Sequence, residues 1–130
     1  MVEFNVKTSK RNELINITSR VEKIVSESKI KNGFCLVYCP HTTAGIIVNE
    51  NSDPDVCGDL LEALEKIVPK ISFRHSEGNS DAHLKSALVG CEKNLIIKEG
   101  ELALGTWQAI FFAEFDGPRE RRVFVELIGK

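Results

Sequence analysis

Residues 34–48 read Phe-Cys-Leu-Val-Tyr-Cys-Pro-His-Thr-Thr-Ala-Gly-Ile-Ile-Val, and this stretch carries the pattern from which the fold class follows. Two apolar runs of β-prone residues, 34–39 and 44–48, flank the polar turn 40–43. The pattern predicts two buried strands joined by a tight turn. It also places His41 on that turn, where a side chain is held by rigid strands and remains within reach of a ligand.

Segments of the same kind lie on both sides of this pair, interrupted by three helical patterns. Further strands are expected over residues 2–6, 14–17, 95–97, 102–104, 107–115 and 123–128. The first helix is expected to open with the capping box Ser19-Arg20-Val21-Glu22. The second begins at Pro54 after the N-cap Asp53 and ends at Pro69.

A third, shorter helix is expected to bury Leu84, Ala87 and Leu88 and to end at Gly90. The element order is therefore ββαββααβββ, with a possible fourth strand at the end. This order predicts an α+β fold, a largely antiparallel β-sandwich dominated by hairpins and covered by about three helices. Residues 1–130 have the length of a single domain.

Composition narrows the functional classes. The chain is 42% hydrophobic and 28% charged, with a formal net charge of −2 and both signs interspersed. This balance argues against nucleic-acid binding, which calls for clustered positive charge. No apolar run reaches the length of a membrane span and the start lacks a secretory signal, so a cytoplasmic protein is expected. The four cysteines are expected to be reduced, mostly as small buried hydrophobes.

The three histidines are the first candidates for chemistry. His75 lies in a polar loop with Glu77, and His83 lies in the first turn of the third helix beside Asp81. Scattered histidines are often surface or capping groups, and their spacing matches no local zinc signature. However, His41, His75 and His83 each lie at the end of an apolar element among polar residues. The hypothesis is that they hold one divalent metal ion with an open coordination position, while Glu77 or Asp81 moves protons or orients ligands.

Other polar groups could bind a phosphorylated substrate or a second kind of metal. The groups that could meet an anion are Thr42, Thr43, Asn79, Arg119 and Arg121. For the arginines, exposed turn charge is the simpler interpretation. Residues 49–55 are interpreted as a strand end and a helix cap, or else as a second shell to the metal or a magnesium site. Trp107 is expected in the core. Gln108 is expected as a buried amide that needs partners and is a further candidate for substrate binding.

Several of these motifs occur together, in a fixed order, in one known family. The motifs are His41-Thr42-Thr43-Ala44-Gly45, Asn49-Glu50 with Asp53-Pro54, Asn79 with Asp81-Ala82-His83, Gly100, and Leu104-Gly105-Thr106-Trp107-Gln108. Through them the chain resembles the YjbQ-like family, also called the secondary thiamine-phosphate synthase family. The resemblance covers essentially the whole chain.

This resemblance implies a compact α+β sandwich that assembles as a homotrimer. It also implies that His41, His75 and His83 are metal ligands in a pocket near the subunit interface. The family name implies a secondary activity that joins hydroxymethylpyrimidine diphosphate and thiazole phosphate and releases diphosphate. A three-histidine site suits zinc, whereas diphosphate departure is usually assisted by magnesium. The physiological substrate therefore stays open, and the alternative is a non-catalytic trimeric module that binds a metal or metabolite.

Overall fold

The computed structural model describes residues 1–130 and contains eight strands and three helices. The strands are β1 (Val2–Lys7), β2 (Glu13–Asn16), β3 (Gly33–Tyr38), β4 (Ala44–Glu50), β5 (Glu92–Lys98), β6 (Glu101–Leu102), β7 (Gln108–Glu114) and β8 (Glu120–Gly129). The helices are α1 (Thr18–Ser28), α2 (Pro54–Ile67) and α3 (Ser80–Val89). The predicted α+β class and element order are confirmed.

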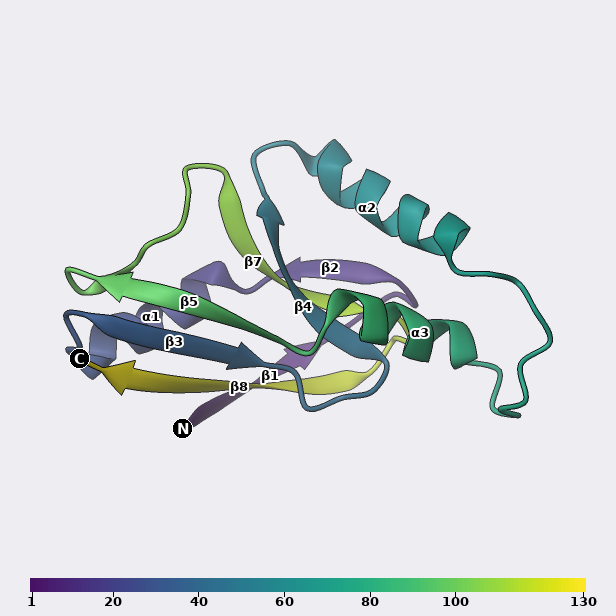
Figure 1. Ribbon diagram of the computed structural model, residues 1–130, viewed down its shortest axis with the longest axis horizontal. Helices are drawn as coiled ribbons and strands as arrows, with labels where there is room; N and C mark the ends of the chain where they lie inside the picture. Colours follow the sequence, from purple (N-terminus) through teal and green to yellow (C-terminus); the bar gives the residue numbers. More distant parts are fainter.

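The strands form two antiparallel sheets. One has five strands in the order β1-β8-β3-β5-β6, and the other has three in the order β2-β7-β4. In Figure 1 the strands β3, β5 and β8 run across the front, while β4 and β7 cross them at an angle. Helix α3 lies beside β4, and α2 lies at the upper right, joined to α3 by a long connection.

The prediction that hairpins dominate is wrong. Strands β3 and β4 belong to different sheets, so the turn at His41 carries the chain from one sheet to the other. Strands β7 and β8 are divided in the same way, and β5 and β6 are the one pair adjacent in both sequence and sheet. The apolar pattern of a strand reports how deeply it is buried, but it does not identify the strand with which it pairs.

The core lies between the two sheets and is closed by α1. In β3 the side chains of Cys35 and Val37 are buried, whereas Phe34 and Tyr38 point to the opposite, exposed face. The main cluster comprises Val6, Ile17, Val21, Val25, Cys35, Val37, Cys39, Ala44, Ile46, Ile97, Ile110, Phe112, Val123 and Val125. A smaller cluster of Ala82, Ala113 and Phe115 packs α3 against the three-stranded sheet.

The helix ends match the sequence only in part. Asp53 caps α2 by accepting a hydrogen bond from Asp55 N, as predicted. The capping box at Ser19 is wrong, because α1 begins at Thr18 and Asn16 Oδ1 accepts from Thr18 N instead. No helix is long and apolar enough to cross a bilayer.

The buried face of α3 is also different from the prediction. It is formed by Ala82, Lys85 and Ser86, whereas Leu88 is 57% exposed. Ser86 fits this face because its hydroxyl donates to Ala44 O at 2.7 Å. The apolar periodicity predicted the wrong face of α3, because the face that packs against the three-stranded sheet contains a lysine and a serine.

Candidate functional site

Four connections of the chain meet at one end of the sandwich. They are the turns after β1, β3 and β7 and the start of α3. Phe115 N donates a hydrogen bond to Thr43 O, which joins the turns after β7 and β3. Asn79 Nδ2 donates to Asp116 Oδ2 and Arg11 donates to Asp81, which joins the start of α3 to the turns after β7 and β1. The polar residues here form two regions of opposite character. One is buried and fully paired, and the other lines an open cavity.

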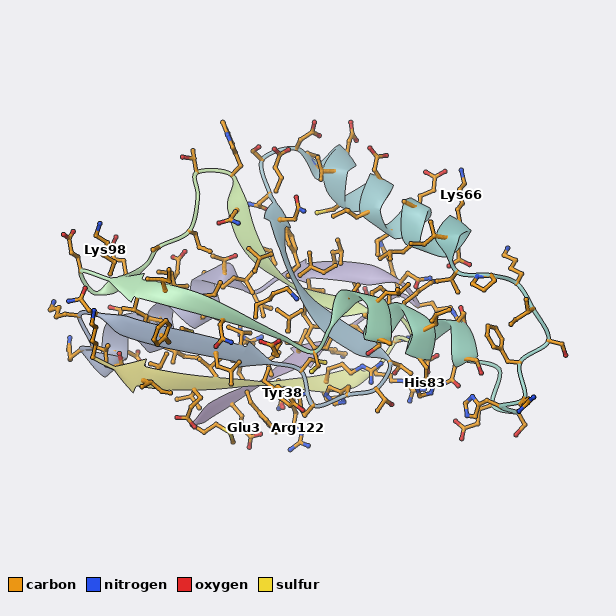
Figure 2. The ribbon with its side chains drawn as sticks, viewed as in Figure 1. Glu3, Tyr38, Lys66, His83, Lys98 and Arg122 are labelled. Carbon is orange, nitrogen blue, oxygen red and sulfur yellow. The ribbon has the colours of Figure 1, made fainter.

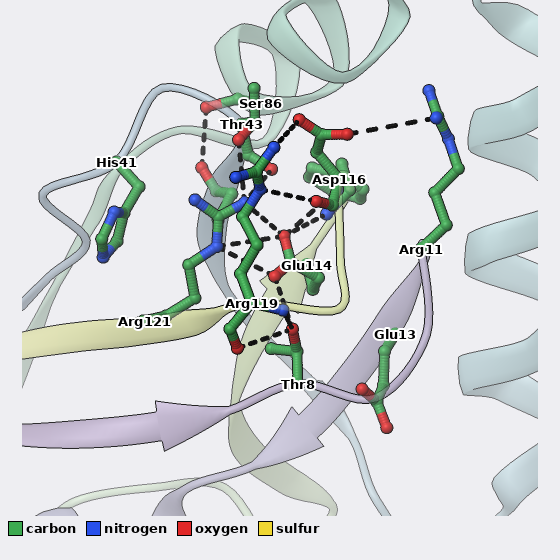
Figure 3. Close-up of polar contacts among 12 residues, drawn as sticks. Thr8, Arg11, Glu13, His41, Thr43, Ser86, Glu114, Asp116, Arg119 and Arg121 are labelled. Atoms are coloured by element: carbon green, nitrogen blue, oxygen red, sulfur yellow. Dashed lines mark hydrogen bonds and ion pairs between the residues drawn. The ribbon is translucent and has the colours of Figure 1, made fainter. Parts of the chain in front are cut away.

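The buried polar cluster consists of Thr8, Thr43, Glu114 and Arg121 (Figure 3). Arg121 Nε donates to the two Glu114 carboxylate oxygens at 2.9 and 3.2 Å, and a terminal nitrogen donates to Thr43 Oγ1 at 2.8 Å. The Thr8 hydroxyl donates to Glu114 Oε1 at 2.7 Å. Burial would raise the pKa of Glu114, but hydrogen bonds from Arg121, Thr8 and the Asp116 backbone hold it below its ordinary value.

The sequence left two interpretations of Arg121, an exposed turn charge and a phosphate clamp, and its place in the structure fits neither. Its side chain is 6% exposed and its guanidinium is committed to Glu114 and Thr43. Thr43 is buried in the same cluster, so its hydroxyl also serves the ion pair. A buried carboxylate needs such a partner, because leaving it unpaired would be costly. The groups of the cluster are therefore committed to one another, and removing either charged partner would be costly.

His41 borders this cluster on the turn between β3 and β4 (Figure 3). Its Nε2 accepts a hydrogen bond from Arg122 N at 2.9 Å, which places the ring proton on Nδ1. Burial and the positive charges of Arg121 and Arg122 lower its pKa, so the ring is neutral at pH 7. A metal bound through Nε2 would have to displace the Arg122 N–H.

Asp116 joins the buried polar cluster to the start of α3. It accepts hydrogen bonds from Asn79 Nδ2 at 2.8 Å and from a terminal nitrogen of Arg119 at 3.0 Å. Burial would raise the pKa of Asp116, but Asn79 and Arg119 lower it. Asn79 Oδ1 is buried without a hydrogen-bond partner. Arg119 keeps about half of its side chain exposed, so it remains accessible to an anion.

The second region is a cavity of about 300 Å³ between the end of α2 and the start of α3, which we call the α3 cavity. It is lined by Glu65, Val68, Pro69, Lys70, Phe73, His75, Gly78, Ser80 and Asp81. His75 Nδ1 lies 3.0 Å from the Ser80 hydroxyl, and His75 Nε2 lies 3.7 Å from Glu77 Oε1. The rings of His75 and His83 meet edge to face, with centroids 5.3 Å apart. Figure 2 labels His83 on α3.

The acidic residues of the α3 cavity are already paired with cations. Arg11 donates to both oxygens of Asp81 at 3.0 and 3.2 Å. The buried Lys85 forms an ion pair with Glu65 and lies 4.0 Å from Asp81. Asp81 is therefore held in place by Arg11, and Glu77 is the exposed carboxylate beside a histidine.

The predicted metal ligands are only partly brought together. His75 and His83 are neighbours, whereas His41 lies on a different turn and is bonded to Arg122. No group of three or more histidine, cysteine or carboxylate side chains is arranged to hold a metal ion. The shared metal site stays a prediction.

The segment 49–55 is too far from His41 to be a second shell to it. Strand β4 spans seven residues and ends at Glu50, so the segment begins roughly 20 Å beyond the turn. Asp53 is used as a helix cap, and Asn49 Oδ1 accepts from Glu50 N. These contacts support the structural interpretation of the segment.

Two predictions at the start of β7 are wrong. Trp107 is 62% exposed and is not a core residue. Gln108 is exposed, and its Oε1 accepts from Gly105 N at 2.8 Å, closing the turn that precedes the strand. Thr42 is exposed on the turn beside His41, where it remains accessible.

Sequence reasoning missed Glu114, Asp116 and Lys85. Glu114 interrupts the apolar run of β7, and such a carboxylate signals a buried ion pair. Asp116 was interpreted only as a turn residue. Lys85 lies three residues after Ala82 and one before Ser86, and this helical spacing could have placed it on the buried face.

Comparisons with known proteins agree on one family. The family model described as "UPF0047 protein YjbQ-like" matches residues 2–130. The UPF0047 protein of Methanocaldococcus jannaschii is 54% identical over 130 residues, covering 99% of this chain and 94% of that protein. The UPF0047 protein YugU of Bacillus subtilis is 49% identical over 128 residues, covering 97% of each chain.

Solved structures share the fold. A YjbQ/UPF0047 family protein from Clostridium acetobutylicum superposes with a TM-score of 0.95 at 52% identity, covering 98% of this chain and 100% of that one. A protein from Sulfolobus solfataricus, described as of unknown function, gives a TM-score of 0.95 at 40% identity over 99% of this chain and 96% of that one. These names state a family and give no activity.

Proposed function

Because this chain belongs to the UPF0047 YjbQ-like family over its whole length, we propose that it is an enzyme that binds a small phosphorylated metabolite in the α3 cavity. The observation that carries the proposal is the cavity itself, which joins a histidine, a hydroxyl and a lysine at a helix start. Its volume of about 300 Å³ is at the lower end of the range for small-molecule sites.

The charges of the α3 cavity favour an anion. The start of α3 carries a partial positive charge and backbone N–H groups that have no helical partner. Lys70 and His75 line the same cavity. Because Glu65 is paired with Lys85 and Asp81 with Arg11, the two acidic lining residues add little repulsion. A phosphate group is the common metabolite group that such a site suits.

Proton transfer is assigned to the pair of His75 and Glu77. The imidazole already contacts the Ser80 hydroxyl through Nδ1 and faces the Glu77 carboxylate through Nε2. A proton can pass between substrate and solvent along this pair. Asp81, bound at both oxygens by Arg11, serves to position the start of α3.

A metal ion is the alternative occupant of the same groups. His75, His83 and Glu77 would then hold the ion instead of moving a proton, and two imidazoles with a carboxylate are a donor set found in catalytic zinc sites. A bound zinc ion would supply Lewis acidity toward the phosphoryl oxygens. As placed, the three groups do not converge on one point, so we assign no reaction step to the ion. A metal analysis of the wild-type protein and His83→Ala tests this part, and unchanged stoichiometry would remove His83 as a ligand.

Binding of inorganic diphosphate, measured by isothermal titration calorimetry, tests the cavity. Lys70→Ala and Ser80→Ala should each weaken binding about tenfold, the loss of one charge-assisted hydrogen bond. Lys66→Ala is the matched control, because Lys66 is also near the end of α2, is exposed and does not line the cavity. Equal binding by all four proteins would contradict the proposed site.

The first activity to assay is the thiamine-phosphate synthase reaction, in which diphosphate leaves the pyrimidine substrate. Release should depend on His75 and be lost in His75→Ala. Diphosphate binding without turnover of any phosphorylated substrate would favour the alternative, a non-catalytic metabolite-binding module.

A homotrimer is the proposed assembly. Two uncovered apolar surfaces support self-association, and the number of subunits rests on the resemblance to the family. On the outer face of the five-stranded sheet, Phe34 pairs with Ile96 and Ile128 in one row, with exposed fractions of 55%, 59% and 63%. Helix α2 is amphipathic but buries no residue completely. Exposed patches of this kind mark interaction sites. Light scattering should give a trimer for the wild type and a smaller species for Phe34→Asp, and a monomeric wild type would refute the assembly.

A further inference from the structure

Cys39 and Cys91 lie opposite each other at the end of the β3–β5 pair. The register of the two antiparallel strands pairs Val37 with Lys93 and Tyr38 with Glu92. One step further along, Cys39 N donates to Cys91 O at 2.7 Å. The hydrogen-bonded ladder therefore continues to this pair, although the two residues are 52 positions apart in the sequence.

The two side chains point to the same face of the sheet. Cys39 follows Val37 by two residues, and both are buried between the sheets. Cys91 precedes Lys93 by two residues, and the Lys93 ammonium reaches inward to Ile46 O at 2.9 Å. Because side chains on one face recur every second residue, Cys39 and Cys91 lie on the same side of the ladder, with Cys39 enclosed between the sheets and Cys91 exposed at its end.

The spacing of such a pair suits a disulfide. Directly opposed residues in a hydrogen-bonded antiparallel pair have Cα atoms about 5.5 Å apart, within the range that disulfides span. Burial raises the pKa of the Cys39 thiol to about 11, and a smaller raising contribution comes from Cys91. Both cysteines are free thiols in the structure.

We propose that Cys39 and Cys91 are a reversible thiol–disulfide pair, oxidised by low-molecular-weight disulfides such as oxidised glutathione. Cys91 is exposed and reacts first, whereas Cys39 is 1% exposed and is out of reach of so large an oxidant. The Cys91 thiolate attacks one glutathione sulfur, breaks the glutathione disulfide and releases one glutathione thiolate.

Cys39 then loses its proton to solvent and attacks the Cys91 sulfur. This step breaks the mixed disulfide, releases the second glutathione and forms the Cys39–Cys91 bond. Two protein thiols are oxidised, and one oxidised glutathione is reduced to two thiols. The new bond links the turn that carries His41 to the short connection between α3 and β5, in which Cys91 lies.

The experiment treats the purified full-length protein with oxidised glutathione, blocks remaining thiols with an alkylating reagent, and measures intact mass and linked peptides. Wild type should lose two hydrogens and give one linked peptide pair containing Cys39 and Cys91, and dithiothreitol should reverse the change. The oxidised protein should also unfold at a higher urea concentration, because the bond closes a long loop.

Single variants separate the two steps. Cys39→Ala should stop at a glutathione adduct on Cys91, and Cys91→Ala should take up no glutathione at Cys39. Cys57→Ala is the matched control and should form the disulfide like wild type, because Cys57 lies on α2, away from this pair. A wild-type protein that stops at the Cys91 adduct, or that links Cys91 to another cysteine, would overturn the proposal.

Discussion

The buried polar cluster and the α3 cavity contain the same kinds of side chain and have opposite properties. In the cluster the Glu114 carboxylate is 0% exposed and meets the Arg121 guanidinium and a threonine hydroxyl, leaving no room for a ligand. In the cavity, a histidine, a serine and a lysine face open space. The same kinds of side chain are thus committed to internal partners where they are enclosed, and are available for binding where they are not.

The comparison predicts its largest effect at Arg121. Arg121→Ala leaves the Glu114 carboxylate buried without its cation, which should cost about 3–5 kcal/mol of unfolding free energy. Arg122→Ala is the control, because the Arg122 side chain is 54% exposed and its loss should cost no more than about 1 kcal/mol. Urea denaturation of both variants measures the difference, and equal losses would show that burial does not separate these two arginines.

Thr8→Val should have the next largest effect. The substitution keeps the shape of the side chain but removes the hydroxyl that donates to Glu114 Oε1 and accepts from Arg119 N. Because the buried Glu114 carboxylate then lacks this donor, the unfolding free energy should fall by about 2 kcal/mol. Thr42→Val, on the exposed turn, should be nearly neutral in the same denaturation experiment, and a comparable loss there would contradict the assignment.

The pH dependence of stability tests whether the neutral His41 ring contributes to the stability of the folded protein. Its folded pKa is lowered from 6.5, so the unfolded chain binds the proton more tightly than the folded protein does. The stability from the neutral ring is present above about pH 6.5 and is lost as the pH falls below that value. Glu114, whose folded pKa is lowered from 4.5, adds a second loss at lower pH, once the pH drops below that value.

Urea midpoints measured between about pH 7.5 and 5.5 isolate the histidine contribution. His41→Gln should flatten the fall in the midpoint, since the amide oxygen can still accept from Arg122 N without binding a proton. His83→Gln, on α3, is the comparison variant, because it leaves the hydrogen bond between Arg122 N and His41 intact. An unchanged slope in His41→Gln would mean that the ring does not titrate with folding.

The smallest effect on stability is expected in the α3 cavity. His75→Ala removes an exposed side chain and Glu77→Gln removes an exposed charge, so each should change the unfolding free energy by less than about 0.5 kcal/mol. The same variants should lose turnover of the phosphorylated substrate. A large loss of stability in His75→Ala would show that His75 has a structural role and would contradict its assignment to the α3 cavity's function.

The sequence predicted the helices and strands better than it predicted which strands pair. The bounds of α2 follow from Asp53, Pro54 and the apolar stripe, because caps and periodicity are local. The split of β3 and β4 between two sheets could not be predicted, because pairing depends on contacts distant in sequence. For the candidate site, the motifs pointed to residues around these turns, but only burial distinguishes the enclosed Arg121 from the half-exposed Arg119.

The sequence by itself determined the α+β class, the order of the elements, the family, and the concentration of polar groups around the turns. These properties depend on local periodicity and short motifs. Only the tertiary structure decided that His75 meets His83 while His41 is held by Arg122, that Arg121 neutralises Glu114, and that Cys39 lies opposite Cys91. Each of these contacts joins residues from different elements, and such neighbours are set by how the two sheets and α3 pack, which no single segment encodes.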